Sequence, residues 1–189
     1  MITELGFALA AAGWASTHLR VAQLQRRLRT DALTGVGNRL ALEQVATRSA
    51  GRPTALFMLD LNEFKAINDT FGHRYGDQVL VHVARRLRAL QSRGQLAVRL
   101  SGDEFAFWAG RWQGGQHFEE LKRRLAAAVA EPMTIDGYTI TVTASVGGAA
   151  GTGRVGLDDL LATADQDMYR GKRTSGAAGR PSRRRATAA

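Results

Sequence analysis

Two adjacent carboxylates at the tip of a short apolar hairpin constrain this chain more than any other feature of its sequence. Residues 99–105 read Arg-Leu-Ser-Gly-Asp-Glu-Phe and lie between two apolar runs. Apolar runs on both sides of a turn sequence predict two antiparallel strands, here 96–101 and 103–110. Asp103 and Glu104 then project together from a rigid turn, which suits magnesium chemistry on a nucleotide. Taken alone, the same four residues also fit an ordinary polar turn.

A second acidic position lies upstream, at the end of a predicted buried strand. Residues 54–61 are almost entirely apolar, and Asp60 stands near their C-terminal end. A charge inside a strand would be costly, whereas a carboxylate at a strand end can serve a metal ion. Residues 62–77 are rich in polar groups and turn glycines, and they lead into an amphipathic helix predicted over 73–91. Asp60 and the hairpin acids are therefore placed to share a divalent cation.

The remaining patterns complete an α+β domain. We predict a further helix over 115–131, a hairpin around the Asp-Gly pair at 136–137 and a last helix over 157–173. The core order βαββαβ is that of a ferredoxin-like, palm-type fold. The expected architecture is an antiparallel sheet flanked by helices and preceded by an N-terminal helix.

The composition fits one globular domain and excludes several kinds of site. The chain has 189 residues, of which 44% are hydrophobic, and a net charge of +9. The absence of cysteine excludes disulfides and thiolate metal ligands and favours a cytoplasmic location. No two of the four histidines are spaced for a helix-borne zinc site, and no Walker A loop is present. A bound nucleotide must therefore be held in another way.

Residues 1–30 are predicted to form one helix. Its apolar segment, residues 5–16, is only about twelve residues long, whereas a bilayer span needs about twenty. Apolar or small side chains recur at a spacing typical of a coiled-coil seam, at Phe7, Ala10, Trp14, Thr17, Val21, Leu24 and Leu28. We interpret the segment as a helix that forms a homodimer. The alternatives are a helix packed on its own domain and a remnant of a membrane anchor, which would give membrane association.

The chain divides into the helix 1–30, a globular domain 31–175 and a basic tail 176–189. The tail contains small residues and arginines but no acid, so it is predicted to be disordered. A contact with nucleic acid or acidic lipid is the alternative to a solvated end. Because the tail has no aromatic side chains on which bases could stack, no dedicated nucleic-acid site is predicted.

Four sequence blocks together resemble the GGDEF-domain diguanylate cyclases. They follow one another in the family's order and extend over about residues 30–176. The blocks are Asp31–Arg39, Asp60–Asp77, the Ser-Gly-Asp-Glu-Phe signature at 101–105, and Ala164–Lys172. The resemblance implies the palm-type fold and a nucleotidyltransferase that condenses two GTP molecules into cyclic di-GMP, releasing two pyrophosphates. It also implies a dimer, because one subunit holds only one GTP.

The resemblance assigns the metal and catalytic positions. Asp60, the backbone carbonyl of Leu61, Asp103 and Glu104 would hold Mg²⁺, or Mn²⁺ in its place. Asp103 occupies the position of the family's proton acceptor. Hard cations of this kind prefer oxygen ligands.

The resemblance also assigns the substrate-binding positions. Asn68 and Asp77 would contact guanine, whose edge needs both an acceptor and a donor, and His73 would lie near the base or ribose. The groups expected to bind phosphate are Lys65, Lys172 and the backbone N–H groups around Glu63 and Phe64. Without the resemblance, Asn68 would be interpreted as a turn or capping residue and each lysine as a surface residue.

Three departures from the family's pattern bear on activity. Ser101 replaces the first glycine of the signature, and Asn62 stands where an aspartate is usual, which removes one charge near the metal. Gly176 lies in the register of an arginine that binds the triphosphate. The alternative to an active cyclase is therefore a catalytically silent GTP-binding or scaffolding module that regulates a partner.

Overall fold

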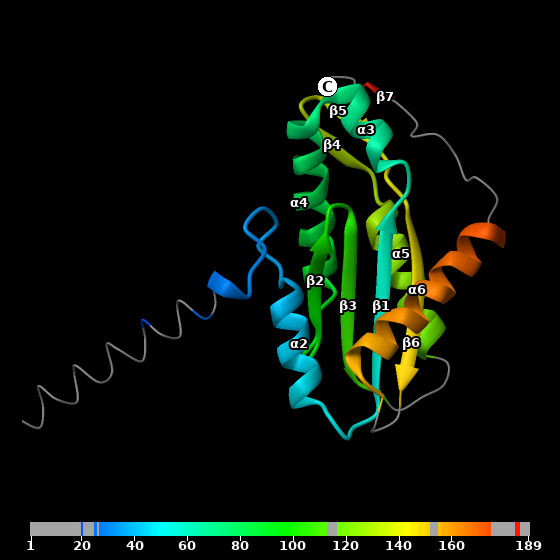
Figure 1. The fold of residues 1–189 in the computed structure, drawn as a ribbon. Helices are drawn as coiled ribbons and strands as arrows, with labels where there is room; N and C mark the ends of the chain where they lie inside the picture. Colours follow the sequence, from blue (N-terminus) through cyan, green and yellow to red (C-terminus); the bar gives the residue numbers. More distant parts are fainter. Residues whose placement is uncertain are drawn as a thin grey trace, which may run out of the picture.

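The computed structural model describes most of the globular domain (Figure 1). The described residues are 20, 25, 27–112, 117–151, 155–174 and 184–185. All of the predicted coiled-coil seam except Leu28, and most of the basic tail, fall outside them. No helix in the described part of the chain is long and apolar enough to cross a membrane.

Four antiparallel strands form the central sheet, in the spatial order β2-β3-β1-β6. They are β1 (Thr54–Leu61), β2 (Leu96–Ser101), β3 (Glu104–Arg111) and β6 (Ala144–Gly151). This sheet, with helices on both faces, confirms the predicted α+β class. The sequence did not delimit β6, because its glycines and alanines have low strand propensity.

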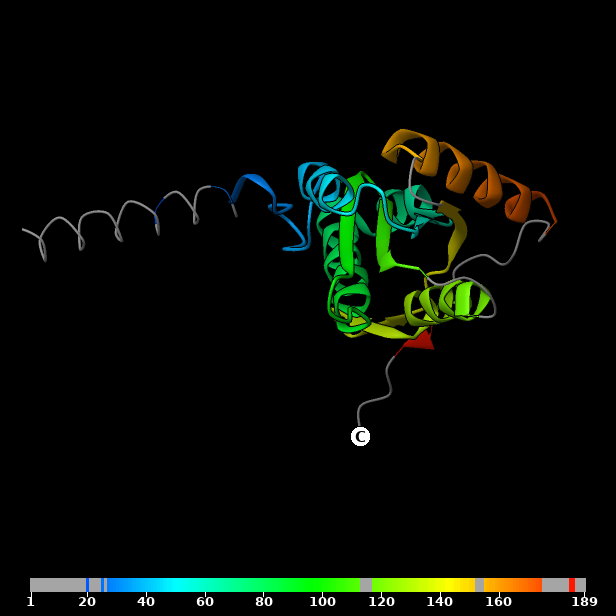
Figure 2. The same cartoon turned by 90° about the horizontal axis from the view of Figure 1, so that it is seen from below.

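Helices cover both faces of the sheet (Figure 2). Figure 2 shows α2 and α6 on one face and α4 and α5 on the other. The helices within the described part of the domain are α2 (Arg39–Arg48), α3 (Phe64–Phe71), α4 (His73–Ala89), α5 (His117–Ala130) and α6 (Leu157–Thr174). The short helix α3 was not expected, because polar residues and a glycine dominate that stretch. It ends at Gly72, whose φ of 84° breaks the chain direction before α4 begins.

Strand β1 is buried on both faces, and its alternation divides the core in two. Phe57 and Leu59 pack with α4 and α5, whereas Leu56 and Met58 pack with α2 and α6. Because successive side chains of a strand point to opposite faces, Asp60 lies on the face of α2 and α6. The position of Asp60 beside α6 is thus set by the register of β1.

A second, smaller sheet contains β4 (Met133–Ile135), β5 (Tyr138–Ile140) and β7 (Arg184–Arg185). The positive φ values of Asp136 and Gly137, 48° and 78°, confirm the predicted hairpin turn. Strand β7 pairs with β5, whose free edge offers unpaired backbone groups. The disorder of the basic tail stays a prediction.

Candidate functional site

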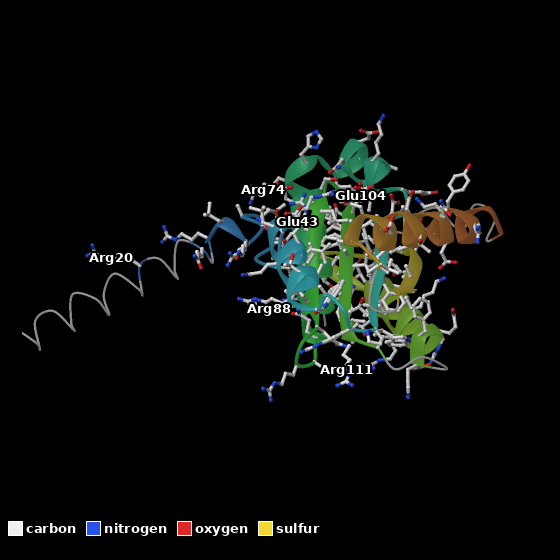
Figure 3. The ribbon with its side chains drawn as sticks, turned by 60° about the horizontal axis from the view of Figure 1, so that its bottom comes forward. Arg20, Glu43, Arg74, Arg88, Glu104 and Arg111 are labelled. Atoms are coloured by element: carbon white, nitrogen blue, oxygen red, sulfur yellow. The ribbon has the colours of Figure 1, made fainter. Side chains whose placement is uncertain are left out.

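Asp60 and Glu104 are direct cross-strand partners at one end of the sheet. They face each other in the antiparallel ladder between β1 and β3. Opposite side chains in such a ladder have Cβ atoms about 4.5–5.5 Å apart. Figure 3 shows Glu104 beside α6, with Arg111, the other end of β3, far away at the opposite end of the sheet. Two of the predicted site carboxylates are therefore brought together by strand register.

Asp103 joins this pair from the turn between β2 and β3. Its carbonyl accepts a hydrogen bond from the N–H of Leu61 at 3.3 Å, which fixes the turn against the end of β1. Burial raises the pKa of the Asp103 carboxyl above its ordinary value, and the neighbouring charges of Asp60 and Glu104 raise it further. The three carboxylates are thus close enough to repel one another.

Lys172 supplies a cation to this acidic cluster from α6. Its Nζ donates a hydrogen bond to Oδ1 of Asp60 at 2.7 Å, and both side chains are partly exposed. Its charge also opposes the rise in the pKa of Asp103. The fourth sequence block is therefore brought to the second and third.

The acidic cluster fits a magnesium ion in part. Within the residues that the structure describes, no three His, Cys, Asp or Glu side chains form a metal-binding group. Magnesium, however, is usually bound by one or two carboxylates together with substrate phosphates and water. The cross-strand pair Asp60 and Glu104 supplies that minimum, and the mutual repulsion felt by Asp103 is what a cation would relieve. The donors are oxygens throughout, as a hard cation requires.

Arg99 anchors the acidic turn to the beginning of the domain. Its Nε donates to the carbonyl of Gly102 at 2.9 Å, and its Nη1 contacts Oδ1 of Asp31 at 3.3 Å. Asp31 also accepts the N–H of Thr34 at 2.9 Å. No role for Arg99 was predicted from the sequence, although a charged residue inside a strand next to the acidic turn was a usable signal. The first and third sequence blocks are thus joined through one guanidinium.

Ser101 introduces no backbone strain at the turn. It is the last residue of β2, and the positive φ of the turn, 45°, falls on Gly102 instead. The Ser101 hydroxyl donates to Oε2 of Glu104 at 2.8 Å. The departure from glycine therefore adds a hydrogen bond that orients one of the acids.

Asn62 is held by both ends of its amide. Its Oδ1 accepts from the Ser145 hydroxyl at 2.8 Å, and its Nδ2 donates to Oγ1 of Thr143 at 2.9 Å. An aspartate here could not donate to Thr143. The second departure thus ties the end of β1 to the beginning of β6.

The predicted guanine residues lie where α3 and α4 meet. A Cβ on Gly76 would overlap Oδ1 of Asn68, so the Asn68 side chain rests against the backbone next to Asp77. His73 is the exposed first residue of α4. Asn68 and Asp77, which are nine positions apart in sequence, are therefore brought to one place by the close approach of two helices.

The predicted phosphate-binding residues of the second block begin α3. Glu63 has a left-handed backbone, with φ of 56°, and turns the chain from β1 into this helix. The side chain of Phe64 is buried in the core, whereas that of Lys65 is exposed. The first N–H groups of α3 therefore follow Leu61 after two intervening residues, Asn62 and Glu63, at the acidic end of the sheet.

A groove adjoins the acids between α2 and α6. Its volume is about 350 Å³, and it extends from the acidic turn along α6. Its lining consists of Arg39, Met58, Leu100, Ser101, Glu104, Leu161, Ala162 and Asp165. One end of the sheet thus carries the acidic cluster, an adjoining groove and the hairpin of α3 and α4.

Two curated proteins are similar to this chain over much of its length. Cyclic di-GMP phosphodiesterase NbdA of Pseudomonas aeruginosa is 39% identical over 133 residues, which are 67% of this chain and 17% of NbdA. Diguanylate cyclase DgcN of Escherichia coli K12 is 34% identical over 157 residues, which are 80% of this chain and 38% of DgcN. The chain therefore spans less than two fifths of the length of either protein.

A solved structure and a family profile agree with these similarities. The crystal structure of the coiled coil and GGDEF domain of DgcB from Caulobacter crescentus, in complex with c-di-GMP, matches with a TM-score of 0.73 and 25% identity. The match covers 92% of this chain and 96% of that one. The profile of the family described as "Diguanylate cyclase, GGDEF domain" matches residues 28–177. With the acidic turn and the palm-type sheet, this match shows that the chain belongs to the GGDEF-domain family of diguanylate cyclases.

Proposed function

We propose that this domain is an active diguanylate cyclase that condenses two GTP molecules into cyclic di-GMP and releases two pyrophosphates. The observation that carries the proposal is the cross-strand pairing of Asp60 with Glu104, next to Asp103 and the ammonium of Lys172. The similarity to a protein named as a diguanylate cyclase supports it.

The acidic cluster has the donors that the reaction needs. A divalent cation, Mg²⁺ or Mn²⁺, held by Asp60, Asp103, Glu104 and the carbonyl of Leu61 would neutralise charge on the reacting phosphate oxygens and acidify the attacking 3′-hydroxyl. Asp103 accepts the proton of that hydroxyl, and its raised pKa brings it closer to the pH at which a base works best.

The chain's cations and backbone hold the triphosphate. Lys172 moves its ammonium from Asp60 to the phosphate oxygens, a short displacement because it already lies at the acids. Lys65 and the N–H groups at Glu63 and Phe64 bind from the first turn of α3, where backbone donors have no partner within the helix. The negative charge that builds up during phosphoryl transfer is met by these donors.

Guanine is recognised by the hairpin of α3 and α4. Asn68 and Asp77 supply an amide and a carboxylate to the base edge, and His73 lies at the base or ribose. A site built to hydrogen-bond one base edge rejects other bases strongly, because mismatched polar groups remain unpaired. This assignment makes GTP the preferred substrate over ATP.

The enzyme acts as a homodimer, because one copy holds one GTP and the second 3′-hydroxyl must come from another copy. We assign dimerisation to the helix of residues 1–30, and the match to a structure that contains a coiled coil and a GGDEF domain supports this. The absence of cysteine and the nucleotide substrate favour action in the cytoplasm, with membrane association through the same helix as the alternative.

A silent GTP-binding or scaffolding module is the second candidate. The observation that favours it is Asn62. Its amide is hydrogen-bonded to Thr143 and Ser145, whereas a carboxylate at this position would add a negative charge to the site. NbdA, which is similar over 133 residues, is named for the breakdown of cyclic di-GMP rather than its synthesis.

Nucleotide chromatography separates the two candidates. The purified chain is incubated with GTP and Mg²⁺, and GTP binding is measured in parallel by calorimetry. We expect the wild type to form cyclic di-GMP and Asp103→Ala to form none. Saturable GTP binding without product, lost in Asn68→Ala, would establish the silent module instead.

A further inference from the structure

Helix α6 packs directly on the backbone of the edge strand β6. A Cβ on Gly147 would overlap the carbonyl oxygen of Ala164 and the amide nitrogen of Met168. On the other face, a Cβ on Gly148 would lie 2.5 Å from Cζ of Phe118 in α5. Two neighbouring glycines therefore let α6 and α5 approach β6 from opposite sides (Figure 2).

One carboxylate joins these three elements around the edge of the sheet. Oδ2 of Asp167, on α6, accepts the backbone N–H of Gly148 at 2.9 Å and the ammonium of Lys122, on α5, at 2.6 Å. The side chains of Asp167 and Lys122 are 37% and 24% exposed, so the contact is partly shielded from water. Burial alone would raise the pKa of Asp167, but the hydrogen bonds from Lys122 and Gly148 outweigh it and lower the pKa. The carboxylate is therefore ionised at neutral pH.

The Gly148 N–H is available to Asp167 because β6 is the last strand of the sheet. Edge strands carry backbone donors that no neighbouring strand satisfies. The bond to Asp167 fixes α6 to one defined position along β6, because a carboxylate one turn away could not reach the same N–H. Asp167 thus sets the register between α6 and the sheet.

The same helix carries the cation of the acidic cluster. Lys172 follows Asp167 by five residues, about 7.5 Å along a helix, and its Nζ lies 2.7 Å from Oδ1 of Asp60. A shift or rotation of α6 would move Lys172 away from the acids. Because Lys172 has a long, flexible stem, its reach depends on where α6 lies.

From this geometry we infer that Asp167 is a positioning residue: with Lys122 and the Gly148 N–H it holds α6 so that Lys172 reaches the acids and the substrate phosphates. The inference rests on the proposed function only in its last part, the delivery of Lys172 to GTP. The other part, the clamp formed by Asp167, Lys122 and Gly148, depends only on the two hydrogen bonds that Asp167 accepts.

A double-mutant cycle on GTP affinity tests the coupling. The proteins are the wild type, Asp167→Ala, Lys172→Gln and the double variant, with GTP binding measured by calorimetry in Mg²⁺. We expect Asp167→Ala to weaken GTP binding about fivefold when Lys172 is present, the factor that a coupling of about 1 kcal/mol gives. In the Lys172→Gln background the same change has almost no further effect. Equal losses in both backgrounds would contradict the inference, since Asp167 would then act on stability alone.

Amide hydrogen exchange tests the contacts of Asp167 with Lys122 and Gly148 in the absence of GTP. We expect Asp167→Ala and Lys122→Met to speed amide exchange at Gly148 and over residues 168–174 beyond any change in global stability. Asp167→Asn, which keeps the shape and one acceptor oxygen, gives a smaller effect and serves if the alanine variant does not fold. The control is Glu120→Gln, which removes an exposed ion pair to Arg123 from the same helix as Lys122.

The two measurements separate the possible failures. If the wild type binds no GTP, the proposed function fails, and the clamp is judged by exchange alone. If exchange at Gly148 and over 168–174 is unchanged in Asp167→Ala, the clamp itself is wrong, whatever the activity.

Discussion

Asp60 and Glu104 stand opposite each other on antiparallel neighbours, and both point to the face of the sheet that α6 covers. The two residues are 44 positions apart in sequence, and the register between β1 and β3 brings them together. The site therefore depends on the pairing of β1 with β3, and a shift of one residue would turn one of the two carboxylates to the opposite face.

The ionised carboxyl of Asp103 should lower the free energy of unfolding, although the proposed reaction needs it. Its pKa is raised in the folded protein above the ordinary value of 3.8, so ionisation is less favourable in the folded than in the unfolded state. Stability therefore falls as the pH rises through the interval between 3.8 and the raised pKa. We expect Asp103→Asn to be more stable than the wild type at pH 7, by about 0.5 kcal/mol because solvent screens the repulsion, and the gain to shrink at pH 4. Urea unfolding at both pH values measures this, with Asp159→Asn, an exposed carboxylate on α6, as the control. A less stable Asn variant at pH 7 would refute the charge repulsion.

Removal of the Lys172 charge should have opposite effects on metal and nucleotide. In Lys172→Gln no ammonium occupies Asp60, so Mn²⁺ should bind more tightly in the absence of GTP. GTP should bind about tenfold more weakly, because a charge-assisted hydrogen bond to phosphate is lost. Calorimetry with each ligand gives both affinities, and Arg88→Gln on α4, far from the acids in Figure 3, is the matched loss of charge. Unchanged GTP affinity would remove Lys172 from the phosphate site.

Asp77 should determine the choice of base. Asn at this position offers a donor as well as an acceptor, so it tolerates adenine better than a carboxylate does. We expect Asp77→Asn to reduce the preference for GTP over ATP at least tenfold, measured as the ratio of kcat/KM for the two nucleotides. Asp69→Asn, an exposed acid on α3, should keep the wild-type ratio. An equal loss of preference in both variants would mean that net charge, rather than contact with the base, governs selectivity.

Restoring the family's glycine at Ser101 should not improve the enzyme. The serine already has an unstrained backbone and donates to Glu104. Ser101→Gly should lower the free energy of unfolding by about 0.5–1 kcal/mol through backbone entropy and leave kcat within about twofold of the wild type. Ser101→Ala separates the lost hydroxyl from the added freedom. A severalfold rise in kcat for the glycine variant would show that the serine limits turnover.

The sequence predicted the elements whose patterns are strong and local. The apolar run that ends at Asp60 and the hairpin that carries Asp103 both lie where periodicity and turn chemistry place them. Helix α3 and strand β6 were harder to predict, because polar residues and glycines obscure their periods. The β6 glycines make sense only in three dimensions, since they are required by the helices that approach them.

Contacts between distant elements could not be predicted from spacing. The link from Arg99 to Asp31 and the two bonds that hold Asn62 each join residues that are 68 or more positions apart. The resemblance supplied the expected roles of single residues, but not which neighbours hold them. Asp167 shows the same limit, because its partners on α5 and β6 come together only in the folded protein.

The most direct test of the proposed cyclase activity is cyclic di-GMP formation by the wild type, Glu104→Gln and Glu120→Gln under identical conditions with GTP and Mg²⁺. Both variants replace a glutamate by its amide, but only Glu104 faces Asp60. We expect product from the wild type and Glu120→Gln and at least a hundredfold less from Glu104→Gln. Product formation by Glu104→Gln at the wild-type rate, or none from the wild type, would contradict it.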